Sequence, residues 1–532
     1  MSKKILAVVL SLILAFSVVA VPVGAADAAS PSFSIENIFY TLIDNLVSFV
    51  LSYLNKYWPG YEDQWAPEEE YVTENFYPGE QTFDRAVSAD SGWKMGYAGA
   101  SLLDGIDATS GDYFLAGTLE PIAGRVPTKV LDDQRVRVYA VSDGTSGVVI
   151  QAVIDGFGFA RGDVQIIREK MEEFATANNV VAINISVLHQ HSCIDTLGMN
   201  VPLAQALLLN TGNAATDGLL DDLKVEKNQE FMENLYSKTV LAMKRAVKNM
   251  KPGELYYGSA DINEYIHDKR EPIAFDGNIN RLRFVPTDGT TETWVLQAAI
   301  HCTMLGAGPD VLTADYPYYI ERTIKSEVGA NVVYIEGAEL AITTDSTPLG
   351  LPEEATREEK MVAYGEALGE KVIAIDNDVA LDPVLNIKMQ EVRLDVTNEI
   401  LTLAAREDII KPVIIKAGDG YQMVTEIGYM ELGNKVAVFI CPGEFDPLLV
   451  FGGAESGSAS WFGEEWTYAP LKDITTCDTV MVFGLCNDQA GYVLRDNEYH
   501  SMFTENEEIN VVSKTAGSTF VNAFIDLVGS TR

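Results

Sequence analysis

Three of the chain's five histidines stand where apolar segments end, and the histidine ring is both a proton acceptor near neutral pH and a common metal ligand. His189 and His191 follow the apolar segment 180–188, and His301 follows segment 295–300. Alternate residues of an extended chain face the same side, so His189 and His191 can converge on one centre. Sites in α/β proteins tend to form at strand ends. A single histidine is more often structural than functional. Because three histidines are grouped at segment ends, a metal or acid–base site and a structural role are about equally favoured here.

Polar residues also follow two further apolar segments. Segment 436–440 runs into Cys441-Pro442-Gly443-Glu444-Phe445, where the Pro-Gly turn can hold Glu444 toward a shared cleft. Segment 480–483 is followed by Asn487 and then Tyr492. Glu444 alone is one of 77 acidic residues, so it becomes a candidate only together with its turn and its neighbours.

The segments that position these side chains indicate buried strands and amphipathic helices. Seven short segments are nearly continuous in apolar, β-branched residues, which favours strands covered on both faces. These strand segments are 136–141, 148–154, 180–188, 295–300, 332–335, 436–440 and 480–483, and the helix segments are 163–176, 229–250 and 357–368. We predict an α/β fold of the mixed α+β type, with buried β-sheets flanked by helices, in a single large domain spanning residues 85–532.

The first residues are organised like a secretory signal. Lys3 and Lys4 precede an uncharged apolar stretch, 5–21, and Pro22 and several alanines follow it. An uncleaved membrane anchor is the alternative, because this stretch approaches the length that spans a bilayer. Pro22 and the small residues after it favour cleavage, so we predict a signal peptide over residues 1–26 and a secreted protein.

The next two segments lead into the main domain. Residues 33–57 are predicted to form an amphipathic helix, because apolar residues recur at helical spacing over 35–54. This helix either packs on the main domain or makes a peripheral contact with lipid; packing is favoured because only Lys56 is basic. The acidic, proline-bearing stretch 58–84 is predicted to be a linker.

The charge of the chain excludes one class of partner. The sequence has 38 basic and 77 acidic residues, a formal net charge of −39, so its surface repels phosphate backbones. Nucleic-acid binding is therefore not expected, and the acidity is otherwise typical of a soluble protein. The oligomeric state is not predicted. Five cysteines do not indicate a disulfide scaffold, and small buried residues are a better interpretation of them than thiolate ligands.

Four motifs, in order along the chain, resemble the catalytic domain of the neutral/alkaline non-lysosomal ceramidases, zinc-dependent amidases that cleave N-acylsphingosine. A fifth match, Lys269-Arg270-Glu271-Pro272, is similar to that family's Asn-Arg-Ser-Pro. The resemblance covers roughly residues 90–505. The four motifs are His189-Gln190-His191-Ser192, resembling His-Thr-His-Ser; Ala298 to Met304 with Thr313-Ala314-Asp315-Tyr316, resembling Phe-Ala-x-His-x-Thr and Ser-Gly-Asp; Pro442-Gly443-Glu444-Phe445, resembling Pro-Gly-Glu-Phe; and Asn487 through Tyr492, resembling Ser-Asn-x-x-x-x-Tyr.

The resemblance implies a set of roles. His191 would lie beside the metal and carry a proton, and Arg270 would hold the developing oxyanion or an anionic group of the substrate. Thr504 stands where the family has its second catalytic tyrosine, and Tyr499 is the tyrosine nearest to that position. Bound zinc would lower the pKa of a water molecule toward about 7. The implied zinc ligands are His189, His301, Glu444 and Tyr492.

The sequence also departs from the family. Ala341 stands at the position of a serine implicated in catalysis, which leaves activated water as the nucleophile. The chain stops about forty residues after Tyr492, so the family's C-terminal immunoglobulin-like domain is not expected. Three hypotheses follow: a secreted zinc hydrolase of N-acyl lipids, a zinc hydrolase of esters or other acyl compounds on the same fold, and a catalytically lapsed binding protein. The retained histidines, Glu444 and Tyr492 argue against the third.

Overall fold

The computed structural model describes residues 64–80, 82–117, 124–198, 225–306, 309–406, 410–453, 465–499 and 510–532, together with a few residues between 44 and 52. The predicted signal peptide over 1–26 and most of the predicted helix over 33–57 lie outside the described residues. Within the described part of the chain, no helix is both long and apolar enough to span a bilayer.

The larger of two main sheets contains nine strands of the described chain. Its order is β11-β9-β8-β6-β1-β3-β4-β5, with β13 paired to β6. The pairs β4–β5 and β9–β11 are parallel, and the other pairs are antiparallel. The strands are β1 (Lys94–Ser101), β3 (Arg135–Ser142), β4 (Val148–Ile154), β5 (Val180–Val187), β6 (Lys251–Asp261), β8 (Asn278–Pro286), β9 (Thr293–Ala298), β11 (Asn331–Glu336) and β13 (Val379–Leu381).

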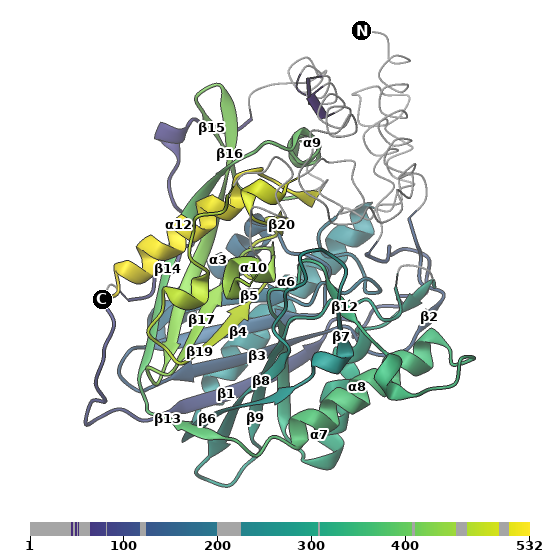
Figure 1. Ribbon diagram of the computed structural model, residues 1–532, viewed down its shortest axis with the longest axis vertical. Coiled ribbons are helices and arrows are strands. Elements are labelled where there is room, and N and C mark those ends of the chain that lie inside the picture. The colour runs from purple at the N-terminus through teal and green to yellow at the C-terminus, as the bar shows by residue number, and fades with distance from the viewer. Residues whose placement is uncertain are drawn as a thin grey trace.

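The second main sheet lies against the first (Figure 1) and has the order β14-β16-β17-β19, with β15 paired to β16. Only the pair β17–β19 of this sheet is parallel in the described chain. Its strands are β14 (Leu385–Asp395), β15 (Ile414–Ala417), β16 (Gly420–Leu432), β17 (Val436–Ile440) and β19 (Thr479–Phe483). Three short pairs complete the strands: β2 (Lys129–Val130) with β10 (Val311–Leu312), β7 (Ile266–Asp268) with β12 (Ile342–Thr344), and β18 (Glu444–Phe445) with β20 (Tyr492–Val493).

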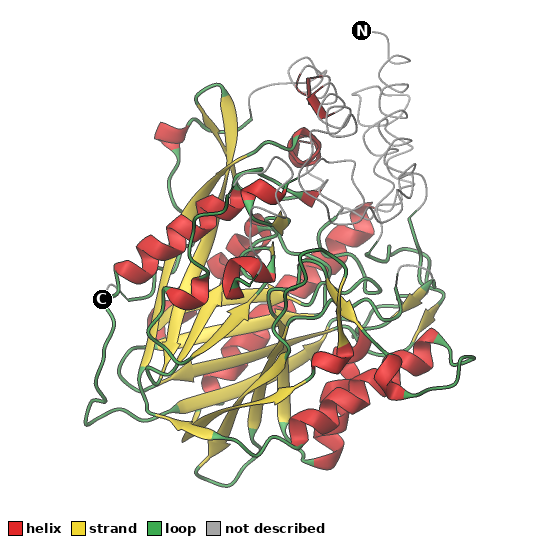
Figure 2. Ribbon diagram, viewed as in Figure 1, coloured by secondary structure: helices red, strands yellow, loops and turns green. Residues whose placement is uncertain are grey.

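Helices flank the two sheets (Figure 2). Helices α3 (Arg161–Ala177) and α6 (Val225–Lys248) pack on the first sheet, α7 (Asp315–Glu327) packs on α8 (Arg357–Ile373) and on β11, and α12 (Ala516–Gly529) packs on β14 and β16. The shorter helices are α9 (Glu399–Arg406) and α10 (Pro447–Phe451). The predicted class, mixed α/β with buried sheets and flanking helices, is confirmed.

Strands such as β3 and β17 are largely apolar because both of their faces are covered. In β3, Val136 and Val138 pack into the core under α3 and α6, whereas Tyr139 and Val141 pack into the core between the sheets. Strand β17 divides in the same way: Val438 faces the first sheet, and its neighbours on either side face α12. Successive side chains of such a strand point to opposite faces, and on both faces they pack against protein and not against water. Polar residues therefore do not recur at every second position.

Residues 64–80 and 82–84, within the stretch predicted to be an acidic linker, run along the second sheet. Tyr71 and Thr73 both donate hydrogen bonds to the Glu391 carboxylate of β14, at 2.9 and 2.6 Å. Isolated backbone bridges join Pro67 to Lys416 and Gly79 to Lys388. This stretch therefore contributes an outer border to the sheet through specific polar contacts.

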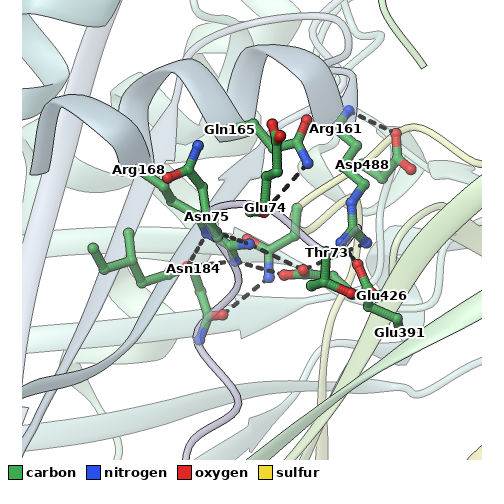
Figure 3. Close-up of polar contacts among 12 residues, drawn as sticks. Thr73, Glu74, Asn75, Arg161, Gln165, Arg168, Asn184, Glu391, Glu426 and Asp488 are labelled. Carbon is green, nitrogen blue, oxygen red and sulfur yellow. Dashed lines mark hydrogen bonds and ion pairs between the residues drawn. The ribbon is translucent and has the colours of Figure 1, made fainter. Parts of the chain in front are cut away.

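A buried ion network joins helix α3 to the two sheets (Figure 3). The Arg168 guanidinium makes a two-pronged contact with Glu426 of β16, at 2.5 and 2.9 Å, and also donates to the Ile183 carbonyl of β5 at 2.7 Å. Arg161 lies 3.5 Å from Glu426 and contacts Glu391. Because all three charges at Arg161, Arg168 and Glu426 are buried, the network holds only while both signs are present.

We expect Glu426→Gln to destabilise the fold by about 3–5 kcal/mol, because it leaves the buried Arg168 guanidinium without a carboxylate and leaves Arg161 with Glu391 alone. Burial alone would raise the pKa of Glu426, but Arg168 and Arg161 outweigh it and the pKa lies below its usual value. The carboxylate therefore contributes stability above the pKa of the unfolded chain and loses it as the pH falls through the folded pKa. In urea unfolding, the difference in the free energy of unfolding between wild type and Glu426→Gln should decrease as the pH is lowered. Glu169→Gln, on the exposed face of α3, is the matched control; an equal loss there would contradict the account.

Candidate metal centre

Four strand ends meet between the two sheets, and each carries a predicted site residue. His189 and His191 follow β5, His301 follows β9, Glu444 begins β18 after β17, and Tyr492 begins β20 after β19. All five residues follow the carboxyl end of a strand, and each of these strands belongs to a parallel pair. The two sheets therefore supply opposite walls of one site.

Asn487 ties the loop after β19 to the edge strand β5. The side-chain oxygen of Asn487 accepts from the backbone amide of Ile185 at 2.8 Å, and the backbone amide of Asn487 donates to the Ile185 carbonyl at 2.7 Å. The residue has a φ of 67°, a left-handed conformation that asparagine tolerates better than most residues. This junction explains why an asparagine stands between the strand and Tyr492.

The loops that carry Glu444 and Tyr492 are paired with each other. Strands β18 and β20 are parallel, with Glu444 opposite Tyr492. The Glu444 amide donates to the Gly491 carbonyl at 3.0 Å, and the Ala490 amide donates to the Pro442 carbonyl at 2.7 Å. A Cβ at Gly443 would lie 2.6 Å from the Gly491 carbonyl oxygen, so the Pro-Gly turn needs glycine for this close approach.

His189, His301 and Glu444 form a compact, buried donor cluster. One ligand atom from each lies within 4.8 Å of the others. The Glu444 Oε2 atom is 3.1 Å from His301 Nε2 and 3.5 Å from His189 Nε2. Two imidazoles and a carboxylate are a common ligand set for a catalytic metal that keeps a position open.

Each of the three histidines is oriented by a backbone carbonyl. The Nδ1 atoms of His189, His191 and His301 lie 2.7, 3.0 and 2.9 Å from the carbonyl oxygens of Phe157, Gly117 and Ile342. A carbonyl oxygen only accepts, so Nδ1 carries the proton and Nε2 presents its lone pair to the cleft. This arrangement is typical of metal-binding histidines.

The fourth polar group of the centre is His191. Its ring centroid lies 4.8 Å from that of His189 and 6.3 Å from that of His301. The Nε2 atom of His191 is buried, and no hydrogen-bond partner for it occurs among the described residues. A Cβ on Gly117 would overlap His191, so the glycine makes room for this ring. A buried imidazole nitrogen without a hydrogen-bond partner, next to a possible metal site, can serve as an additional metal ligand or as a proton acceptor.

Burial keeps these rings neutral. It lowers the pKa of His189, and the Glu444 carboxylate offsets only part of that effect. Burial, followed by the neighbouring His189 and His301, places the pKa of His191 well below its usual value. Neutral imidazoles are the form that binds a metal or accepts a proton.

A cavity of about 320 Å³ opens beside this centre. His189, His191, Glu444 and Tyr492 line its polar side, together with Gln489 and Asp488. Its remaining wall is mostly apolar and comes from β15 and β16 of the second sheet, from α9 and from loops. The apolar lining residues include Leu197, Val396, Leu401, Ile410, Ile414, Met423 and Val512.

Two solved structures resemble this chain over most of its length. A neutral ceramidase from Pseudomonas aeruginosa aligns with a TM-score of 0.60 and 13% sequence identity, covering 83% of this chain and 74% of that chain. The chain has a neutral ceramidase-like fold. A ceramidase complexed with C2 aligns with a TM-score of 0.59 at 13% identity, over 82% of this chain and 75% of that chain. No family model matches the sequence, and no curated protein does.

Within this ceramidase-like fold, Ala341 lies beside two of the predicted site residues. It packs against a small apolar cluster that contains Tyr492, Tyr499 and Leu340. The backbone next to it, at Ile342, holds the ring of His301. Residue 341 therefore lies next to candidate site residues, and its alanine side chain offers no nucleophile.

Arg270 has a different environment from the histidines. Its guanidinium donates to the Glu498 carbonyl at 3.1 Å and is electrostatically coupled to Asp446, two residues after Glu444. Arg270 is not among the described residues that line the cavity. Its predicted contact with an oxyanion or anionic substrate group stays a prediction, as does the catalytic role of Tyr499.

The five cysteines form no disulfide, and all of them lie in the described part of the chain; four are buried and Cys477 is half-buried. The Cys302 thiol contacts the Glu336 carboxyl at 2.9 Å. Burial places the pKa of the Cys302, Cys193 and Cys441 thiols well above the usual value, so they stay protonated. The metal-type cluster found among the described residues contains no cysteine, in line with the interpretation of small buried residues.

Sequence reasoning missed two residues of the site. Phe157 stacks on His189 with ring centroids 4.4 Å apart, and its carbonyl orients that ring. Gln489 donates through Nε2 to Glu444 Oε1 at 3.3 Å. Gln489 lies inside the motif that runs from Asn487 to Tyr492, so its place between two candidate residues was the available signal.

Proposed function

We propose that the protein is a zinc-dependent hydrolase that cleaves the amide bond of N-acyl lipids such as ceramide. The observation that carries this proposal is the buried His189–His301–Glu444 cluster at the polar side of an apolar cavity, with the unpartnered His191 Nε2 beside it in the described structure. The fold of the two ceramidases supports the same reaction class.

The residues present fit zinc. Two neutral imidazoles and one carboxylate suit Zn²⁺, with Tyr492 as a further oxygen donor on the strand paired with Glu444. When bound, zinc supplies a Lewis acid that polarises the acyl carbonyl and lowers the pKa of water. Glu444 supplies the negative charge of the ligand set, and the three backbone carbonyls that hold the rings fix the direction of each Nε2 atom.

His191 is placed to move the proton. Its Nε2 accepts a proton from the attacking water and then donates it to the amide nitrogen as that nitrogen leaves. The carbon–oxygen bond forms, the carbon–nitrogen bond breaks, and the products are a fatty acid and an amine. Water is the nucleophile because residue 341 is alanine. The buried site excludes bulk solvent, which keeps His191 neutral between turnovers.

The apolar part of the cavity is proposed to hold the hydrocarbon chain of the substrate. A wall of aliphatic side chains favours an acyl or alkyl chain over a polar one by the hydrophobic effect. The proposal is tested by incubating the purified protein with ceramide, N-acyl amino acids and matched acyl esters, with and without chelator. Amine release that chelator abolishes supports it. Turnover of esters alone supports the ester hydrolase, and metal binding without turnover supports a binding protein.

Leu401 offers a test of the chain-binding wall. It lies on α9 and lines the cavity, so Leu401→Trp fills space that a long chain would use. We expect kcat/KM for a hexadecanoyl amide to fall about tenfold or more relative to a hexanoyl amide. Leu241→Trp, on the exposed face of α6, is the control. Equal effects of Leu401→Trp on both chain lengths would contradict this use of the cavity.

The place of action is also proposed. A cleaved signal over residues 1–26 would release the protein from the cell, and the strongly acidic surface would keep it in solution, away from anionic membranes. The helix predicted over residues 33–57 would pack on the main domain or, as the alternative, give a peripheral contact with lipid. Terminal sequencing of the protein recovered from culture medium tests the cleavage: an intact Met1 would contradict it.

A further inference from the structure

Gln489 lines the cavity of the metal centre, and its side chain carries a hydrogen-bond acceptor that has no partner in the described structure. Its Nε2 atom donates to Glu444 Oε1 at 3.3 Å. A carboxylate oxygen only accepts, so this contact fixes which end of the amide faces Glu444. The other end, Oε1, is buried and has no donor among the described residues. The side chain lines the same cavity as His191 and Tyr492.

The backbone of Gln489 is fixed on both sides. The Asp488 carboxylate accepts from the Gln489 amide at 2.9 Å and from the Arg161 amide, at the start of α3, at 2.9 Å. On the other side the Ala490 amide donates to the Pro442 carbonyl at 2.7 Å. The orientation of the Gln489 side chain is therefore set before any substrate arrives.

A buried carbonyl oxygen without a donor is unfavourable in a folded protein, and most such groups in native structures have a partner. In a cavity that holds a substrate, that partner is a donor on the substrate. The scissile bond of an N-acyl lipid carries one donor, the amide N–H, next to the carbonyl that the metal centre would receive. An ester or a tertiary amide carries no donor at this position.

We propose that Gln489 Oε1 accepts the N–H of the scissile amide and makes the site selective for secondary amides over esters. This inference rests on the proposed function and specifies its substrate class. Gln489 forms no covalent bond: the amide N–H donates to Oε1, and the leaving amine still donates after His191 has delivered its proton. The contact strengthens as the nitrogen becomes protonated, because charged donors make stronger hydrogen bonds. It therefore raises kcat as well as binding.

The competing role for Gln489 is structural: it would only hold Glu444 in place. The two roles predict different specificity. Loss of support for Glu444 weakens the metal centre and slows every acyl substrate by the same factor. Loss of the N–H acceptor slows secondary amides alone.

The test compares three octanoyl substrates, an N-alkyl amide, its N-methyl derivative and the matching alkyl ester, in wild type and Gln489→Met. Wild type is expected to prefer the N–H amide over the N-methyl amide by about 10- to 100-fold in kcat/KM. In Gln489→Met this preference should shrink to within about threefold, and kcat/KM should fall further for the N–H amide than for the ester, because only the amide loses a hydrogen bond to the substrate. Gln165→Met, a surface substitution on α3 (Figure 3), is the control with an unchanged preference.

Each outcome decides the inference. An equal loss on amide and ester, or an unchanged preference in Gln489→Met, overturns it and leaves amide hydrolysis intact as the function. The wild-type comparison of the N–H and N-methyl amides needs no variant, so equal rates there overturn the inference even if Gln489→Met fails to fold. A wild type that cleaves the ester and neither amide overturns the proposed function together with the inference.

Discussion

Replacing Glu444 with glutamine is expected to release zinc and to remove nearly all amide hydrolysis. The carboxylate is the only anionic member of the donor cluster found among the described residues, and it reaches both His189 and His301. An amide oxygen of the same shape carries no charge to offset that of the metal. Residues that merely support a ligand change metal affinity by about 10- to 100-fold, so loss of this ligand should cost at least as much.

The loss of activity should exceed the loss of affinity. A bound metal contributes several kcal/mol to stabilisation of the transition state, and each 1.4 kcal/mol is a factor of ten in rate, so kcat/KM should fall on the order of 10³-fold. Zinc content measured by mass spectrometry and amine release from an N-acyl lipid check both effects. Glu366→Gln, at an exposed ion pair with Arg322, is the matched control.

The fold should survive Glu444→Gln. The Glu444 carboxylate is buried, and burying a charge is unfavourable, so removing that charge should not destabilise the fold. Chelated wild type and chelated variant should therefore melt at similar temperatures. A variant that stays folded, binds no zinc and still cleaves amides would contradict the account.

Replacing His191 with alanine is expected to lower kcat by about 10²- to 10⁴-fold while zinc stays bound. The prediction follows from the position of its Nε2, which is buried beside the metal-type cluster and lacks a protein partner among the described residues. The candidate ligands His189, His301 and Glu444 each keep their own contacts without it. The substitution therefore separates proton transfer from metal binding.

The measurement is kcat on an N-acyl amide together with bound zinc per chain. His267→Ala is the control, because that histidine is exposed on β7 and distant in sequence from each ligand. Zinc lost together with activity would make His191 a ligand. Full activity in His191→Ala would show that another group moves the proton.

The strands that build the site were predictable because they are buried on both faces. The segments 436–440 and 148–154 correspond to β17 and β4 with the same bounds, and helix α8 begins at Arg357 as predicted. Strand β14 was not predicted, because Leu385, Ile387 and Met389 alternate with polar residues and a search for continuous apolar runs passes over such a strand. Its period of two was the available signal.

The metal cluster was partly predictable. His189 and His301 stand directly after apolar segments, so their residue types and positions indicate a shared site. Their meeting with Glu444 depends on β5 lying at the edge of one sheet beside the loop after β19, which Asn487 secures. That arrangement is tertiary. No periodicity in the sequence encodes it, and only the resemblance of motifs in order anticipated it.

Two further features of the structure, the contact of Gln489 and the Arg168–Glu426 ion pair, depend on partners that are distant in the sequence. The role of Gln489 follows from a 3.3 Å contact across two loops, and glutamine in a loop is unremarkable as a residue type. The pairing of Arg168 with Glu426 spans 258 residues of sequence. Among 77 acidic residues, the partner of one arginine cannot be chosen from the sequence.

The central claim is that zinc at the His189–His301–Glu444 cluster drives hydrolysis of an N-acyl amide. The most direct test is to strip the purified protein with chelator and add zinc back in small steps while amine release is followed. We expect no release without metal, a linear rise, and a plateau at about one zinc per chain. Full amine release by the stripped protein, or a plateau of bound zinc without any amide turnover, would contradict the account.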